Sequence, residues 1–180
     1  ALRRDVERHP RDGGRRLALA GTLENAGFAE ESERALREGI ERGVPDFRLH
    51  ALLARRCAET GRMAEATRLA AQALAGHPEL ELVREQAAVV ALVGQRAEEA
   101  LTHTGWLLQR RPLGQFALAL HVLALRLAGD ARWERLADPQ RVCRVATLDA
   151  PAGFDSIEAF NAALGERLRG RHTLKAHPLL

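Results

Sequence analysis

The sequence has no tyrosine, and only 4% of its 180 residues are aromatic. Aromatic side chains are the platforms on which unpaired bases stack, so this scarcity argues against single-stranded nucleic-acid binding. Lysine is almost as rare, because Lys175 is the only one among 27 basic residues. This preference for arginine, together with abundant alanine, indicates the coding bias of a bacterial genome rich in G and C. Acidic residues are interspersed with the arginines and the net charge is only +3, which leaves RNA binding as the weakest interpretation.

Cysteine and long apolar runs are scarce as well. Cys57 and Cys143 are too few for a disulfide scaffold, so a reducing compartment is the default, and we expect Cys57 to be a packing residue of a helix. No apolar run approaches the ~20 residues of a membrane span, and the chain does not open on a signal segment. We therefore expect a cytoplasmic protein that does not use a membrane as its partner.

Motifs for common enzyme chemistry are missing too. There is no glycine-rich phosphate loop, no paired cysteine set for zinc and no nucleophile elbow. The Asp12-Gly13-Gly14 run is a turn before a helix rather than a nucleotide site. We expect no catalytic residue, no metal ligand and no cofactor within this segment.

What the sequence does contain is a period. Successive prolines are 35, 33 and 34 residues apart, and successive glycines 34, 33 and 35 apart, at Pro10, Pro45, Pro78 and Pro112 and at Gly27, Gly61, Gly94 and Gly129. Proline stops a helix because it cannot donate the required N–H, and glycine opens the tight turn between two helices. A period near 34, with proline and glycine recurring at these positions, predicts an array of helical hairpins.

Small residues at helical spacing complete the pattern. In the second unit they are Ala54, Ala66 and Ala73, followed by Pro78. This pattern resembles the tetratricopeptide repeat, although the large aromatic residue and the tyrosine usual in the first helix are absent. The resemblance implies an all-α fold, a helical-hairpin solenoid of about 3.5 to 4 units. We expect a short strand and one further helix to follow it. We expect residues 1–10 to be the end of a preceding repeat, 11–138 the array and 139–180 a non-repeat tail.

Two units depart from regular spacing. In the third, Gly94 and Pro112 are one residue out of register, which predicts a turn that is longer by one residue. In the fourth, we predict a first helix over Phe116–Ala128, a turn at Gly129 and a short second helix over Arg132–Ala137, broken by the following Asp-Pro pair.

The tail from residue 139 does not follow the 34-residue period. Residues 141–148 are rich in β-branched side chains and predict a strand, which would pack on the last repeat or pair with another chain. A helix follows from about Ser156 to Arg169, with Asp155 as its N-cap and Glu158 completing a capping box. Its apolar stripe consists of Ile157, Phe160, Ala163, Leu164 and Leu168.

The tail also resembles the entry segment of bacterial proteins in which tetratricopeptide repeats precede a 2-oxoglutarate/Fe(II)-dependent oxygenase domain. The resembling residues are Trp133, Leu136, Val142, Val145, Leu148, Pro151, Gly153, Phe154, Phe160, Asn161, Leu164, Leu168, His172, His177 and Pro178. The resemblance implies that the strand is the first of a double-stranded β-helix, and that Fe(II) and 2-oxoglutarate bind in a catalytic domain beyond Leu180.

Within the chain itself, the only His-x-Asp/Glu triplet is His77-Pro78-Glu79, which we interpret as a helix stop at a repeat junction. His172 and His177 are five residues apart around a helix end and are interpreted as loop or packing residues.

The resemblance to tetratricopeptide repeats implies a superhelix whose first helices line a concave face that holds a protein or peptide. The candidate partner-binding residues are Glu24, Asn25, Arg48, Leu52, Arg55, Glu59, Arg84 and Glu85. Arg48 and Arg55 lie two turns apart on one helix face and could fork to a carboxylate; the alternative is that both are solvated and paired to nearby glutamates. The lysine- and asparagine-rich set that clamps a terminal carboxylate in one variant of the family is missing.

Two functional hypotheses therefore stand beside the RNA interpretation. The first is a protein-interaction module without a catalytic centre of its own. The second is the substrate-recruiting region of an oxygenase. The basic run Arg167, Arg169 and Arg171 is a solvated helix end placed favourably against the helix dipole, or a surface for an acidic partner.

Overall fold

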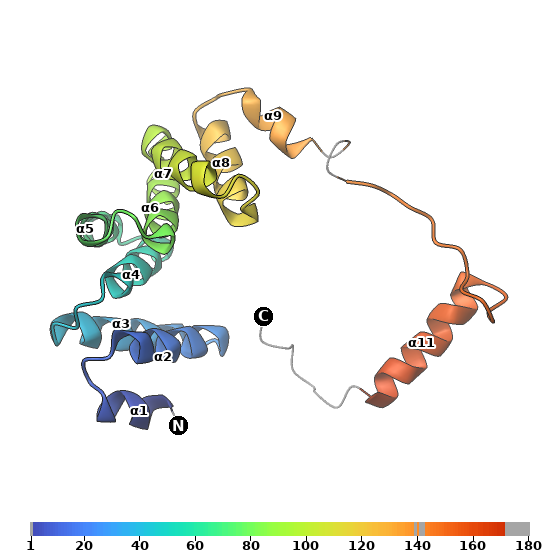
Figure 1. The fold of residues 1–180 in the computed structure, drawn as a ribbon, viewed down its shortest axis with the longest axis horizontal. Helices are drawn as coiled ribbons and strands as arrows, with labels where there is room; N and C mark the ends of the chain where they lie inside the picture. The colour runs from blue at the N-terminus through green and yellow to red at the C-terminus, as the bar shows by residue number, and fades with distance from the viewer. Residues whose placement is uncertain (1, 139, 141–142, 172–180) are drawn as a thin grey trace. The chain divides into compact units, whose positions relative to one another are not determined.

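A computed structural model describes residues 2–138, 140 and 143–171 (Figure 1). The chain divides into two compact units, Ala1–Ala137 and Asp138–Leu180. The described residues form helices and no strand, so the all-α class is confirmed. None of the described helices combines the length and the apolar character that crossing a bilayer requires.

The period is sharper in the backbone than in the sequence. The first helices of successive hairpins are α2 (Gly13–Asn25), α4 (Phe47–Glu59), α6 (Glu81–Val93) and α8 (Gln115–Leu127), and each begins 34 residues after the one before. The second helices α3 (Ala29–Glu41), α5 (Met63–Gly76) and α7 (Ala97–Arg110) keep the same spacing. Helix α1 (Leu2–Arg8) precedes this series and the short α9 (Arg132–Ala137) ends it, in agreement with the helices predicted for the fourth unit.

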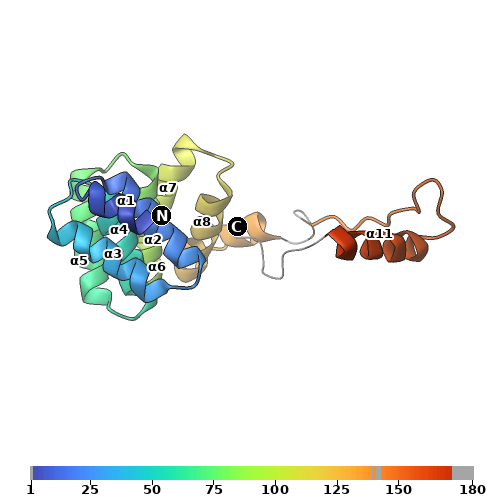
Figure 2. The same cartoon turned by 90° about the horizontal axis from the view of Figure 1, so that it is seen from below.

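Packing follows the same rule. Each helix from α1 to α9 packs against the next, and the first helices also pack against one another, α2 on α4, α4 on α6 and α6 on α8. Figure 1 shows the helices following one another from α1 to α8, and Figure 2 views the same array from below, with its helices overlapping. The first helices therefore form a continuous row, which is the packing of a helical repeat.

The turn inside each hairpin is the same in all four units. A residue with positive φ follows each first helix, at Gly27, Gly61, Gln95 and Gly129, with φ of 81°, 79°, 58° and 70°. The next amide donates to the carbonyl five residues earlier at 2.8–2.9 Å, which satisfies the helix end in a Schellman motif. The prediction of a longer third turn is wrong, because Gly94 lies at the helix end with φ of −77° and Gln95 occupies the left-handed position.

Small residues let the helices approach closely. Ala54, Cys57, Ala66 and Ala73 are completely buried, and Cys57 is the packing residue that was predicted. A Cβ added at Gly39 of α3 would lie 2.7 Å from Cδ of a side chain on α2 and 2.8 Å from Cδ1 of one on α4. The three helices can pack only around a residue without a side chain at this position.

Arginines close two of the junctions between hairpins. Arg16 is 1% exposed, and its guanidinium donates to the carbonyl of Pro10 at 3.4 Å. Arg84, two repeats later, donates through Nε to the carbonyl of Pro78 at 2.7 Å. Each arginine follows its proline by six residues, so a side chain from the next helix satisfies a carbonyl that the ended helix leaves free.

Ion pairs join the first hairpin to the second. Arg37 of α3 donates to both carboxylate oxygens of Glu65 on α5, at 2.6 and 3.1 Å. Arg62, in the turn before α5, donates to both oxygens of Glu33 on α3, at 2.7 and 2.6 Å. The Arg37 hydrogen bond lowers the pKa of Glu65 to about 2, and the Arg62 hydrogen bond lowers the pKa of Glu33. These two-pronged bonds hold the second helices in register.

The predicted strand is not formed. Residues 143–148 are exposed and lack secondary structure, while Arg141 and Val142 lie outside the described residues. β-Branched residues favour an extended backbone, but a strand needs a ladder partner, and the described part of the chain offers none. Pairing with another chain stays a prediction.

The tail helix α11 (Ile157–Arg171) begins one residue later than predicted. The hydroxyl of Ser156 accepts a hydrogen bond from the Ala159 amide at 3.2 Å, so Ser156 caps the helix in place of the predicted Asp155. No residue of α11 is buried. Of its predicted apolar stripe, Phe160 meets the Phe154 ring edge-on at 5.2 Å between centroids, while Leu164 and Leu168 are exposed.

The left-handed turn of the third hairpin yields a test. Replacing Gln95 by glycine should stabilise the chain by about 1 kcal/mol, because a side chain with positive φ costs roughly this much. The matched change Gly61→Ala should destabilise it by about the same amount for the same reason. Both are measured by urea unfolding, and a Gln95→Gly variant less stable than the parent would contradict the turn geometry.

The ion pair between α3 and α5 yields a second test. Glu65→Gln should lower the free energy of unfolding at pH 7 by about 1–3 kcal/mol, because it removes a charge-assisted two-pronged bond. Since the folded-state pKa of Glu65 lies below the ordinary 4.5, its contribution is complete above about pH 4.5 and is lost as the pH falls towards 2. The variant should therefore lose less stability than the parent over that range, as followed by circular dichroism. Parallel acid titrations of parent and variant would refute the pair's contribution.

Candidate interaction surface

The row of first helices presents one common surface, called here the first-helix face. On α4 it is formed by Arg48, Leu52, Arg55 and Glu59, which are spaced by four, three and four residues and therefore share one side of the helix. The 34-residue spacing defines the equivalent positions on the other first helices. They are Gly14, Ala18, Gly21 and Asn25 on α2, Leu82, Gln86, Val89 and Val93 on α6, and Phe116, Leu120, Leu123 and Leu127 on α8. Gln86 and Leu120 are buried beneath this face.

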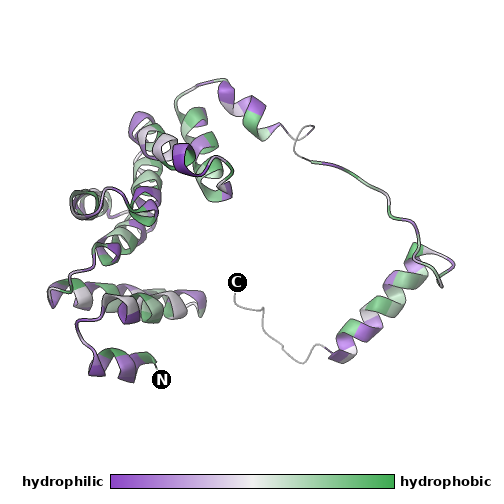
Figure 3. Ribbon diagram, in the orientation of Figure 1, coloured by the Kyte–Doolittle hydropathy of each residue, from purple (hydrophilic) through white to green (hydrophobic). Residues whose placement is uncertain are grey.

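The chemistry of this face changes along the row. It is small on α2, charged on α4 and largely apolar on α6 and α8, and α8 is mostly coloured as hydrophobic in Figure 3. Three of its large apolar side chains are well exposed, with Val93 at 44%, Phe116 at 47% and Leu123 at 50%. Several exposed large apolar residues on one face of neighbouring helices are typical of a surface that meets another molecule.

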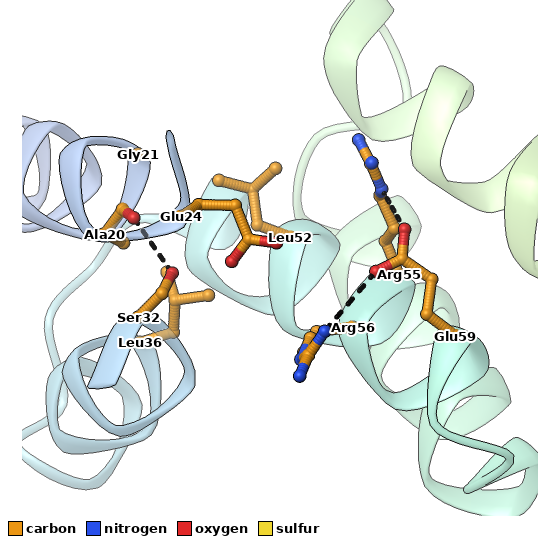
Figure 4. A pocket seen from close by; sticks show the side chains of 9 residues that line it. All are labelled: Ala20, Gly21, Glu24, Ser32, Leu36, Leu52, Arg55, Arg56 and Glu59. Carbon is orange, nitrogen blue, oxygen red and sulfur yellow. Dashed lines mark hydrogen bonds and ion pairs between the residues drawn. The ribbon is translucent and has the colours of Figure 1, made fainter. Parts of the chain in front are cut away.

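A pocket of about 120 Å³ opens on the same face between α2, α3 and α4 (Figure 4). Its lining residues are Ala20, Gly21, Glu24, Ser32, Leu36, Leu52, Arg55, Arg56 and Glu59. The Ser32 hydroxyl donates to the Ala20 carbonyl at 2.9 Å, which ties α3 to α2 and uses the hydroxyl internally. The side chains of Ala20, Leu36 and Leu52 leave the pocket with an apolar lining.

Gly21 explains why the pocket lies here. At the equivalent position α4 carries Arg55, α6 carries Val89 and α8 carries Leu123. A Cβ built at Gly21 has no described atom within 4 Å, so the space that a side chain would occupy is open. Gly21 therefore lines the pocket without a side chain that could extend into it.

The charged side chains beside the pocket are only partly satisfied. Nε of Arg55 donates to Glu59 at 2.7 Å, and its two terminal nitrogens have no hydrogen-bond partner among the described residues. The buried Nε of Arg56 likewise has no partner within the part of the chain that the structure describes. The nearest carboxylate oxygens to Arg56, from Glu33 and Glu59, are 3.9 Å away. The exposed Arg55 can therefore still receive an acceptor at its terminal nitrogens, such as a carboxylate or a peptide carbonyl, whereas the Nε of Arg56 is buried.

Of the eight predicted partner-binding residues, four meet at the pocket: Glu24, Leu52, Arg55 and Glu59. Asn25 is exposed at the end of α2, outside the pocket lining. Arg48 lies on the first-helix face, but its guanidinium donates to Asp46 at 2.7 and 2.9 Å and lowers the pKa of that carboxyl group.

The two remaining predicted residues lie on α6. Arg84 donates to the Pro78 carbonyl and stacks on the Trp106 ring with its guanidinium carbon 4.8 Å from the ring centre, so it is held at the hairpin junction. Glu85 is half-buried, and burial raises the pKa of its carboxyl group. Because Arg48 is bonded to Asp46 and Arg55 to Glu59, the structure shows the paired alternative rather than two free arginines forked towards one carboxylate.

Five residues that line the pocket were not predicted: Ala20, Gly21, Ser32, Leu36 and Arg56. Alignment of the units at a 34-residue spacing would have placed Gly21 opposite Arg55 and shown the missing side chain. Arg56 and Ser32 carry no such signal, because their position beside the pocket depends on how α3 packs against α4.

The chain's histidine-carboxylate triplet lies elsewhere. Nδ1 of His77 is 3.1 Å from Glu79, and the His77 ring stands edge-on to Phe47 at 5.5 Å between centroids, at the end of α5. The described residues contain no group of three or more histidine, cysteine, aspartate or glutamate side chains arranged to hold a metal ion. His172, His177 and Pro178 lie outside the described residues.

Comparison of the chain with protein-family models, with curated proteins and with solved structures finds no match. The resemblances to tetratricopeptide repeats and to the oxygenase-linked segment therefore stay predictions. The function has to be argued from the geometry of the first-helix face.

The partly satisfied Arg55 yields a test of the surface. Arg55→Ala should change the free energy of unfolding by no more than about 0.5 kcal/mol, because exposed ion pairs four residues apart on a helix contribute little. Arg37→Ala is the matched change within the buried pairs, and it should cost about 1–3 kcal/mol. Urea unfolding of the two variants decides the point, and equal losses would show that Arg55 is needed for the fold.

Proposed function

We propose that this chain is a protein-interaction module, related to tetratricopeptide repeats, whose first-helix face binds a polypeptide segment of a partner protein. One observation carries the proposal: the pocket beside Gly21 and the exposed side chains of Val93, Phe116 and Leu123 lie on the same face of one row of helices. Apolar side chains in the centre and charged groups beside them are the usual composition of a protein-binding surface.

The architecture supports the same conclusion. Each hairpin packs on its neighbours alone, so the array offers an extended surface made of equivalent positions. An extended segment can contact several such positions at once. A polypeptide fits the chemistry better than a nucleic acid, because the far half of the face is apolar and Glu24 and Glu59 lie beside the arginine at the pocket. Both cysteines are free thiols, which is compatible with work in the cytoplasm.

The oxygenase interpretation has no comparable support. It depended in part on a strand over 141–148, and residues 143–148 are not a strand. A requirement for Fe(II) and 2-oxoglutarate in a catalytic domain beyond Leu180 stays a prediction from the resemblance.

A selection experiment tests the proposal. Random peptides displayed on phage are selected against the purified chain, and the binding site of each selected peptide is mapped by changes in the amide resonances. Peptides should shift the amide resonances of α2, α4, α6 and α8 more than those of the second helices. The substitutions Phe116→Asp and Leu123→Asp should weaken binding at least tenfold, because each places a charge in the apolar half of the face.

Arg68 supplies the matched control, since it is an exposed residue of the second helix α5. Arg68→Asp should leave the affinity unchanged. Selected peptides that bind only the second helices, or a selection that yields no binding peptide, would refute the proposed function.

A further inference from the structure

The size of the pocket beside Gly21 limits what can enter it. Its volume of about 120 Å³ is slightly smaller than the ~150 Å³ of an apolar cavity that accepts benzene. A leucine, isoleucine or methionine side chain fits this space. The apolar lining from Ala20, Leu36 and Leu52 excludes a charged end group at the bottom of the pocket.

The charges beside the pocket are unevenly distributed. Figure 4 shows Glu24 on the α2 side and Arg55, Arg56 and Glu59 on α4, with Glu59 joined to both arginines. The terminal nitrogens of Arg55 have no hydrogen-bond partner among the described side chains and backbone groups, whereas the unpartnered Nε of Arg56 is buried. A carboxylate on the α4 side can reach the terminal nitrogens of Arg55, while one on the α2 side would approach Glu24.

We infer that the pocket beside Gly21 is the anchor site for one aliphatic side chain of the partner segment, and that a carboxylate next to this side chain binds the terminal nitrogens of Arg55. The inference rests on the proposed function and specifies the chemistry of the segment. The aliphatic group fills the space beside Gly21, and the acidic neighbour accepts from the guanidinium nitrogens that Arg55 does not use for Glu59. The apolar half of the face, on α6 and α8, then binds the rest of the segment.

Because Gly21 has no side chain, a larger residue can be introduced there without a steric clash. A Cβ at this position has no described neighbour within 4 Å, so Gly21→Leu can fill the pocket without disturbing the packing of α2. Alanine should even stabilise the chain here, because glycine is unfavourable inside a helix. Gly105 in α7 has the same open surroundings, and Gly105→Leu is therefore the matched control for added bulk on a second helix.

The test uses the selected peptides together with three blocked dipeptides: acetyl-Leu-Glu-amide, acetyl-Leu-Lys-amide and acetyl-Ala-Glu-amide. Affinities are measured by nuclear magnetic resonance titration, and unfolding curves confirm that each variant is folded. The Leu-Glu compound should bind at least threefold more tightly than the other two. Gly21→Leu should weaken both it and the selected peptides at least tenfold, as expected for exclusion of one buried aliphatic side chain, and Gly105→Leu should leave both affinities unchanged.

The outcomes separate the two proposals. If selected peptides bind the first-helix face but Gly21→Leu does not weaken them, the anchor site is wrong and the proposed function stands. If the Leu-Lys compound binds as tightly as the Leu-Glu compound, the carboxylate part of the inference is wrong. If no peptide binds the face at all, the proposed function fails and the inference fails with it.

Discussion

Close approach between neighbouring helices is the constraint on which the rest of this structure depends. A helix of one hairpin can meet two others only where one of them carries no bulky side chain, as at Gly39 and the buried alanines. Repetition of this arrangement every 34 residues builds the row of first helices. The same lack of side chains, occurring once on the outer side of α2 at Gly21, opens a pocket instead of closing an interface.

The positions of glycine and proline in the sequence predicted the hairpins well, but they predicted the conformation of the third turn wrongly. The four glycines and four prolines were sufficient for the period, because turns and helix ends impose strong demands on the backbone. Gly94 was misleading, since glycine can also end a helix with an ordinary negative φ, while Gln95 bears the left-handed conformation. The strand over 141–148 failed for another reason: a local preference for extended backbone does not supply the partner that a strand needs.

The candidate surface was only partly predictable. Helical spacing placed Leu52, Arg55 and Glu59 on one side of α4 without any coordinates. It could not show that Arg48 donates a hydrogen bond to Asp46, or that Arg84 donates to the Pro78 carbonyl and stacks on Trp106. These contacts depend on how the helix ends fold. Gly21 was overlooked because a residue without a side chain draws attention only when its equivalents in the other repeats are compared.

The ion pairs between hairpins and the proposed interaction surface lie on different helices of this array. The two-pronged ion pairs of Glu33 with Arg62 and of Arg37 with Glu65 come from the second helices and the turns that precede them. The first helices bury large side chains such as Leu49, Leu53 and Val90 in the core, while Arg55 and Leu123 on their outer face are exposed. A partner that uses the terminal nitrogens of Arg55 would therefore leave the contacts between the hairpins intact. This separation is what allows a stack of nearly identical units to differ so much in surface chemistry from α2 to α8.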